Sequence, residues 1–305
     1  MIDDTPNDSP PHGSTLWYAT TASMNTLIPY TAGTQAPRVP LPANACDSHI
    51  HLYDAAMSND ASVLVQGTAA NYRLLQSRLG TSRTVIIQPA AHKFDNRVTV
   101  QGIAALGPER TRGVAVLTPD VTDAELVALH AGGIRGIRFT LFNPKTAQTR
   151  FDWVEPLAAR VSELGWHVQL HWRADQIVEH VAILDRLRCA IVMDHMARLP
   201  APQAQSHEAF GIVARLLERG RTWVKLSGPY LDDKAPDYAS RAGIVRAFCR
   251  AAPDRLVWGS DWPHPTESTK PDDAHLLDRL GEWVDDTMLR NRILVDNAAV
   301  LYGFV

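Results

Sequence analysis

Eight short runs of apolar residues recur along the chain, and each is followed by a polar turn and then by a segment with helical periodicity. Runs such as TVIIQ, GVAVL and RLVWG are almost continuously apolar, which is typical of strands that are covered on both faces in a parallel sheet. We expect the strands at residues 45–51, 84–89, 113–117, 136–140, 167–171, 190–195, 222–227 and 256–261.

Amphipathic segments separate these runs and predict helices that turn one face to the sheet. They cover residues 71–79, 95–106, 122–131, 152–164, 174–187, 207–219, 238–251 and 272–284. Eight strand–helix units in sequence predict a single (β/α)8 TIM barrel over residues 45–305, with its active site at the carboxyl ends of the strands. The alternative is an open, doubly wound sheet, but the sequence has no glycine-rich dinucleotide turn after the first strand.

The segment before the first strand has a different character. Residues 1–44 are rich in Pro, Thr, Ser and Ala without periodicity, which predicts an irregular arm. Its start, MIDDTPNDSP, carries acidic residues where a secretory signal needs lysine or arginine, and no apolar block of signal length follows. No later segment approaches the roughly 18 uninterrupted apolar residues of a membrane span. We therefore expect a soluble, cytoplasmic protein.

Composition narrows the classes of partner. The 305 residues carry a formal net charge of -3 and no long run of like charge, so we expect no binding to nucleic acid or to an anionic membrane. A small molecule is the expected ligand, and the protein is expected to be a monomer or a small homo-oligomer. Cys46, Cys189 and Cys249 are too few and too scattered for a disulfide framework, and they fit buried residues in a reducing compartment.

The first candidate for chemistry is the segment ACDSHIHLYD at residues 45–54. It places His49 and His51 one residue apart at the end of a strand. Because side chains alternate between faces with period two, both imidazoles and Asp47 should point the same way. The alternative is that the two histidines only form hydrogen bonds at the end of the strand. Residues on other strands must decide between this structural role and a chemical one.

Such partners lie at the ends of three further strands. Strand five ends in His171, strand six in His195 and strand eight in Asp261, with His264 in the loop that follows. Several imidazoles and one carboxylate can bind a divalent metal ion and leave one coordination position for water. The same residues can equally form a pocket that polarises a substrate carbonyl without a metal. Asp261 can be a ligand or the base that deprotonates water, with a proton affinity raised by screening from solvent.

Three of these segments resemble the amidohydrolase superfamily, and specifically its lactonase branch around 2-pyrone-4,6-dicarboxylate lactonase. They are DSHIH (47–51), VMDHM (192–196) and WGSDWPHP (258–265), of which the last is the most specific. The resemblance runs from about residue 42 to 304 and includes QPAAHKFDN (88–96) and ALHAGGIRGIRF (128–139). The same branch includes members similar to sulfomuconolactone hydrolase and to lactone isomerases.

The resemblance implies hydrolysis of a small anionic lactone in the catabolism of aromatic compounds. Asp261 would be the general base, and His49, His51 and His195 would polarise the lactone carbonyl. Arg138 matches a position of the family that contacts a substrate carboxylate, for which the planar guanidinium is well suited. The alternative for Arg138 is an ion pair that closes the barrel.

Four more residues are candidates for substrate binding. His92 and Asn96 match a loop of the family that lines the pocket, with a solvent-facing position as the alternative. Arg198, in the loop after strand six, falls at the barrel mouth and can hold a substrate anion. Lys225, on strand seven, shares a strand face with Trp223 and Ser227, and either touches the ligand or faces elsewhere.

The resemblance leaves the cofactor open. The pyrone dicarboxylate lactonases act without a metal and lack a histidine at the end of strand five. With His171 present, the metal set of the wider superfamily is complete in His49, His51, His171 and Asp261. The alternatives are therefore one zinc or manganese ion, or a metal-free enzyme. A lactone isomerase and a ligand-binding barrel without catalysis are the rival functions.

Overall fold

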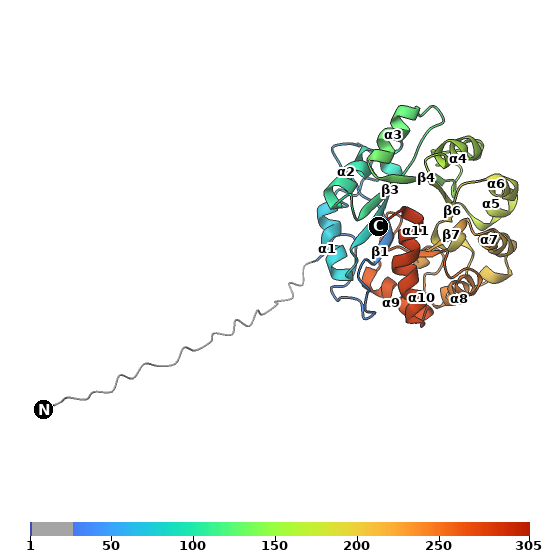
Figure 1. Cartoon of the computed structure of the whole chain (residues 1–305). Helices are drawn as coiled ribbons and strands as arrows, with labels where there is room; N and C mark the ends of the chain where they lie inside the picture. Colours follow the sequence, from blue (N-terminus) through green and yellow to red (C-terminus); the bar gives the residue numbers. More distant parts are fainter. Residues whose placement is uncertain (2–26) are drawn as a thin grey trace.

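The predicted (β/α)8 TIM barrel is confirmed by the computed structural model, which describes Met1 and residues 27–305. Eight parallel strands follow one another around a ring in the order β1 to β8 (Figure 1). Every predicted strand overlaps an observed one. The strands are β1 (Cys46–Ile50), β2 (Arg83–Ile87), β3 (Thr111–Ala115), β4 (Ile134–Thr140), β5 (His167–His171), β6 (Ile191–Met193), β7 (Thr222–Leu226) and β8 (Leu256–Trp258).

Helices alternate with the strands and form the outer layer (Figure 1). All eight predicted helical segments are helical, although the segment 174–187 contains two short helices that meet at His180. The helices are α1 (Ala69–Leu79), α2 (Arg97–Leu106), α3 (Asp123–Ala131), α4 (Val154–Ser162), α5 (Ala174–Glu179), α6 (Val181–Arg186), α7 (Glu208–Glu218), α8 (Ala242–Ala251) and α9 (Asp273–Trp283).

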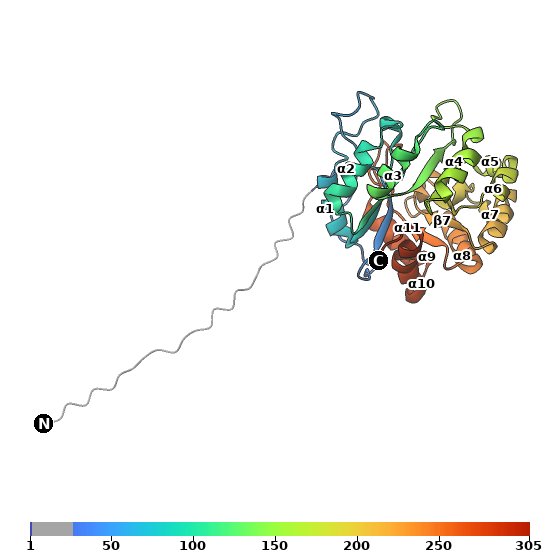
Figure 2. The same ribbon diagram turned by 45° about the horizontal axis from the view of Figure 1, so that its top comes forward.

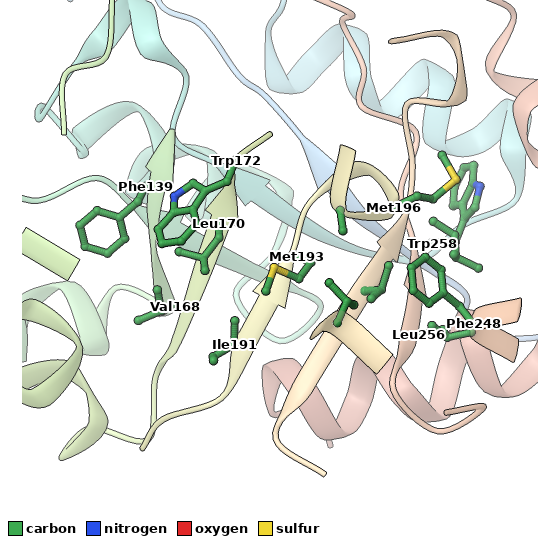
Figure 3. Packing of buried hydrophobic residues seen from close by; sticks show 14 of the residues in the cluster. Phe139, Val168, Leu170, Trp172, Ile191, Met193, Met196, Phe248, Leu256 and Trp258 are labelled. Atoms are coloured by element: carbon green, nitrogen blue, oxygen red, sulfur yellow. The ribbon is translucent and has the colours of Figure 1, made fainter. Parts of the chain in front are cut away.

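Apolar side chains fill the space between the sheet and the surrounding helices. Figure 3 shows Phe139, Leu170, Met193 and Trp258 among these buried residues, which come from four different strands. Burial of apolar surface contributes roughly 25 cal/mol per Å² to folding. This layer therefore fixes the strands and, with them, the side chains at their ends.

The ring closes between β8 and β1 through the residues that follow β8. The amide of Asp261 donates to the carbonyl of His49, and the amide of His51 donates to the carbonyl of Trp262, both at 2.8 Å. A Cβ atom at Gly259 would lie 2.6 Å from the Cβ of His49. Glycine is therefore required where the two strands approach most closely.

The expected orientation of Asp47 is wrong. The register between β1 and β2 shifts between Asp47 and Ile50, so the simple alternation does not hold along β1. Asp47 instead faces α1, where its Oδ2 accepts hydrogen bonds from the hydroxyls of Tyr72 (3.2 Å) and Ser260 (2.6 Å). The carboxylate joins α1 to the closing segment of the barrel.

A C-terminal segment that the periodicity did not predict closes the amino end of the barrel. It consists of α10 (Thr287–Asn291), a π-helical turn (Arg292–Asp296) and α11 (Asn297–Tyr302). Its last residues pack on the strand starts, where the guanidinium groups of Arg83 and Arg112 lie 5.2 and 4.8 Å from the ring centre of Phe304. Figure 2 shows the loop after β1 at the opposite end from α10, so the carboxyl ends of the strands remain the open end.

The described part of the predicted arm runs along the outside of the barrel. Residues 27–44 contain no helix or strand, and the carbonyl of Pro29 accepts a hydrogen bond from the indole of Trp262 at 2.9 Å. Residues 2–26 of the arm lie outside the described residues. None of the helices in the described part of the chain is long and apolar enough to cross a membrane.

His167 makes the stability of the barrel depend on pH. Its ring is enclosed in the barrel with its centre 5.5 Å from that of Tyr302, and burial, followed by the charge of Lys225, lowers its pKa from 6.5 to about 3. Between these two values the unfolded chain binds a proton that the folded chain does not. The free energy of unfolding should therefore fall by about 5 kcal/mol as the pH drops through this window.

We expect the variant His167→Gln to lessen this dependence by the share of one histidine, as measured by urea denaturation at a series of pH values between neutral and acidic. The variant His275→Gln changes a half-buried histidine of α9 and serves as the control, with an unchanged slope. Equal slopes for wild type and His167→Gln would show that this imidazole does not carry the effect.

Candidate active site

Three predicted residues meet at the seam between β1 and β8. The Oδ1 atom of Asp261 lies 3.4 Å from Nε2 of His49 and 3.6 Å from Nε2 of His51. From the end of β6, the ring of His195 lies 4.9 Å from that of His49, measured between ring centres. All four side chains are buried, so distant parts of the sequence form one group.

Hydrogen bonds fix the orientation of two of these imidazoles. Nδ1 of His51 lies 2.8 Å from the carbonyl oxygen of Ile87, which can only accept, so Nδ1 carries the hydrogen. In the neutral ring, Nε2 of His51 then presents a lone pair towards Asp261. Nδ1 of His195 lies 2.9 Å from the hydroxyl of Ser227, which leaves its Nε2 on the opposite side of the ring.

Two of the imidazoles, His195 and His49, are neutral and the carboxylate is ionised near neutral pH. Burial lowers the pKa of His195 to about 4, and burial followed by Lys225 lowers that of His49 well below its ordinary value. Burial alone would raise the pKa of Asp261, but His195, His51 and His49 outweigh it and hold the pKa well below 3.8. The raised proton affinity expected for Asp261 is therefore wrong.

Asp194 is a buried acid that the sequence reasoning missed. Its Oδ2 accepts hydrogen bonds from Nε of Arg138 (2.9 Å) and from the amide of Gln169 (3.0 Å), while its Oδ1 lies 3.5 Å from Nδ1 of His49. Burial would raise its pKa, but Arg138 and His49 outweigh burial and keep it well below 3.8. The sequence feature that could have identified Asp194 is its position directly before His195 in the VMDHM segment.

Lys225 lies inside the barrel, beside His49. Its ammonium group is fully buried and donates to the carbonyl of Ser48 (3.0 Å) and to Oε1 of Gln169 (2.8 Å), and it lies 3.8 Å from Oδ1 of Asp194. Burial lowers its pKa to about 8. These partners occupy the ammonium, so Lys225 supports the histidine layer from within the barrel.

The two arginines differ in how much of the guanidinium is engaged. Arg138 uses Nε for the ion pair with Asp194, and among the described residues none accepts a hydrogen bond from its terminal nitrogens. Arg198 donates through Nε and Nη2 to Asp232, both at 2.9 Å, and through Nη1 to Nε2 of His171 at 3.0 Å. The ion pair that was the alternative for Arg138 is thus present with its terminal nitrogens left over, whereas Arg198 holds neighbouring loops.

His92 and Asn96 are both buried and bind backbone groups. Nε2 of His92 accepts from the amide of Asp54 at 3.2 Å. The side-chain amide of Asn96 forms two hydrogen bonds of 2.9 Å with the backbone of Val116, one in each direction. These contacts hold the loop after β1 and the end of β3, and the solvent-facing alternative is wrong for both residues.

A cavity of about 180 Å³ opens beside His171. It is lined by residues at the ends of β2 to β5, including Gln88, Thr140, Phe142 and His171, and the ring of His171 lies 5.1 Å from that of His195. A larger cavity of about 730 Å³ between α2 and α3 is lined by no histidine. Of these two cavities, only the smaller is lined by a histidine of the predicted set.

The model of a protein family described as amidohydrolase matches residues 46–304. The chain belongs to this family. It is 30% identical to a 2-pyrone-4,6-dicarboxylate hydrolase of Comamonas testosteroni, over 89% of this chain and 94% of the relative. A 4-sulfomuconolactone hydrolase of Rhizobium radiobacter is 29% identical over 91% of this chain and 97% of the relative.

A solved structure agrees with these relatives. The unliganded crystal structure of an Agrobacterium tumefaciens protein superposes with a TM-score of 0.83 at 26% identity, covering 90% of this chain and 99% of the other. Together the comparisons confirm the predicted lactonase branch of the amidohydrolase superfamily and the prediction that the chain is a hydrolase.

The site of this amidohydrolase fits one divalent cation with three protein ligands. Ligand atoms of His49, His51 and Asp261 lie within 4.8 Å of one another. The lone pair of His51 faces an ionised carboxylate, an arrangement that a cation between them stabilises. For His49, a hydrogen on Nδ1 can point to Asp194 and leave Nε2 as a ligand. His171 lies outside this group, because its Nε2 accepts from Arg198.

We expect the amidohydrolase, after dialysis against zinc and removal of free ion, to retain about one zinc per chain by elemental analysis. The variant His51→Ala should lose the ion, because it removes the lone pair next to Asp261. The variant His171→Ala should keep it. Loss of zinc from His171→Ala as well would instead support the four-residue set predicted from the sequence.

Proposed function

We propose that the chain hydrolyses a small anionic lactone by attack of water on the ring ester carbonyl. The observation that carries this proposal is the single oxygen of Asp261 that faces Nε2 of both His49 and His51. A neutral imidazole layer around an ionised carboxylate suits proton transfer from water. The relatives support the substrate class, since both are named as hydrolases of cyclic esters that carry acidic groups.

The reaction uses Asp261 first as a base and then as an acid. Oδ1 takes a proton from water as the water oxygen bonds to the carbonyl carbon. The bond between that carbon and the ring oxygen then breaks, and the proton passes from Asp261 to the ring oxygen, which leaves as an enol or alcohol. The balance is one water consumed and one new carboxylic acid formed, which releases its remaining proton to solvent as it ionises.

The histidines have different parts in activating the carbonyl. With its single hydrogen on Nδ1 and bound to Ile87, the neutral ring of His51 offers Nε2 as an acceptor or ligand. His49 and His195 each present Nε2 to the site and can donate to the carbonyl oxygen. A zinc or manganese ion held by His49, His51 and Asp261 would supply Lewis-acid polarisation of that oxygen.

Arg138 gives the site its preference for an anion. Its terminal nitrogens are unpaired among the described side chains, and its ion pair with Asp194 holds the guanidinium in place. A carboxylate or sulfonate on the lactone can bind both terminal nitrogens. The rest of the ring then lies in the cavity lined by Gln88, Thr140 and Phe142, which bring no further charge.

The variant Asp261→Asn should lower kcat/KM by about 10³-fold, since it removes the general base while preserving size. The assay is a panel of lactones that includes 2-pyrone-4,6-dicarboxylate and 4-sulfomuconolactone, run in heavy-oxygen water. Hydrolysis places one solvent oxygen in the product, whereas an isomerase places none. Asp278→Asn on α9, which loses an ion pair with Arg38, is the control and should keep full activity. Undiminished turnover by Asp261→Asn would exclude the mechanism.

The variant Arg138→Gln should raise KM for the acidic lactone by about 10- to 100-fold, the effect of losing one hydrogen bond between charged groups. Glutamine keeps an N–H for Asp194 but loses the charge. The methyl ester of the same lactone provides the comparison, because its KM should be similar for variant and wild type. An equal rise for acid and ester would show that Arg138 supports the fold only.

A further inference from the structure

A buried chain of hydrogen bonds runs from Asp261 away from the barrel mouth. The phenol of Tyr230 lies 2.6 Å from Oδ2 of Asp261 and 2.8 Å from Nδ1 of His264. Nε2 of His264 in turn lies 3.1 and 3.2 Å from the two carboxylate oxygens of Asp273. The four side chains come from β8 and its loop, from the 3-10 turn η5 (Pro229–Leu231) and from α9.

The donors and acceptors have a fixed order in the part of this chain from Asp261 to Nδ1 of His264. Tyr230 has one hydroxyl hydrogen, and the ionised Asp261 can only accept, so the hydrogen points to Oδ2. The phenolic oxygen is then free to accept from His264, whose other nitrogen is held by Asp273. A hydrogen bond to a carboxylate of this length is among the strong, charge-assisted type.

We propose that Tyr230 is a positioning residue for Asp261, and that His264 and Asp273 fix Tyr230 in turn. A carboxylate has two equivalent oxygens and can rotate about its Cβ–Cγ bond. Tyr230 occupies Oδ2, and this leaves Oδ1 facing His49 and His51. The inference rests on the proposed function, since it concerns the base of that reaction.

The backbone of Asp261 supports the same conclusion. Its φ of 68° lies in the left-handed region, which residues other than glycine rarely adopt. Such a conformation persists where surrounding contacts determine it, and here the amide of Asp261 also donates to the carbonyl of His49. Backbone and side chain are thus both held, as a base that must meet one water requires.

The test is the variant Tyr230→Phe, which removes only the hydroxyl. We expect kcat to fall by about 10- to 100-fold with KM nearly unchanged, because the substrate still binds but Oδ1 is no longer held in line. The solvent deuterium isotope effect on kcat should rise as proton transfer becomes slower. The double variant Tyr230→Phe/His264→Gln should be no slower than Tyr230→Phe, since both changes break one chain.

Tyr72→Phe is a matched control, since it removes a buried hydroxyl that donates to a buried carboxylate, Asp47, on the outer face of the same seam. It should keep kcat and the isotope effect of the wild type. If Tyr230→Phe does not fold, His264→Gln alone should show the same split between kcat and KM.

Three outcomes would overturn parts of the argument. Wild-type kcat in Tyr230→Phe, with Asp261→Asn inactive, would remove the positioning role and leave the proposed function standing. Equal losses of kcat in Tyr230→Phe and Tyr72→Phe would show that both variants act through general destabilisation, and the positioning role of Tyr230 would be rejected. Full turnover by Asp261→Asn would end the proposed function itself.

Discussion

The closure of the barrel between β8 and β1 is the constraint on which the site depends. The same two backbone hydrogen bonds that close the ring, from Asp261 to His49 and from His51 to Trp262, also set the distance between the carboxylate and the imidazoles. Behind them, Asp47 accepts from both the amide and the hydroxyl of the residue before Asp261. Burial raises the pKa of Asp47 to about 6, so its hydrogen bonds only partly offset the cost of enclosing it.

The interior next to this seam is polar, and its charged side chains lie beside charges of the opposite sign. Arg138 pairs with Asp194 at 2.9 Å, and the ammonium of Lys225 lies 3.8 Å from the same carboxylate. Groups that are buried and already oriented need not reorganise as charge develops in a reaction, which is the main source of electrostatic catalysis in enzymes. A buried pair that loses one member leaves an uncompensated charge, so the layer resists change as a unit. This explains why Asp194 and Lys225 are enclosed together next to His49.

The sequence predicted the barrel and the residues at strand ends because both follow from periodicity, which depends on local geometry. What it missed depends on contacts between distant segments. Tyr230 lies in a 3-10 turn beyond β7, where no alternation indicates a direction. Asp47 was assigned to the wrong face because a shift in register interrupts β1. Arg198 is a residue type that commonly binds anions, which led to its prediction as a substrate ligand. Its partner Asp232 follows 34 positions later, in a loop whose path the sequence does not specify.

The turn η3 (His195–Arg198) connects these observations with the metal question. Its four residues have φ values of 49°, 54°, 58° and 48°, and left-handed backbone costs roughly 1–2 kcal/mol for each residue that is not glycine. Contacts at its end offset this strain, since Arg198 pairs with Asp232 and lies 4.1 Å from the ring centre of Phe142. In this position Arg198 also donates to Nε2 of His171. His171, which completes the four-residue metal set predicted from the sequence, thus accepts a hydrogen bond from Arg198 in the folded chain. The group that could hold an ion then has three ligands, His49, His51 and Asp261.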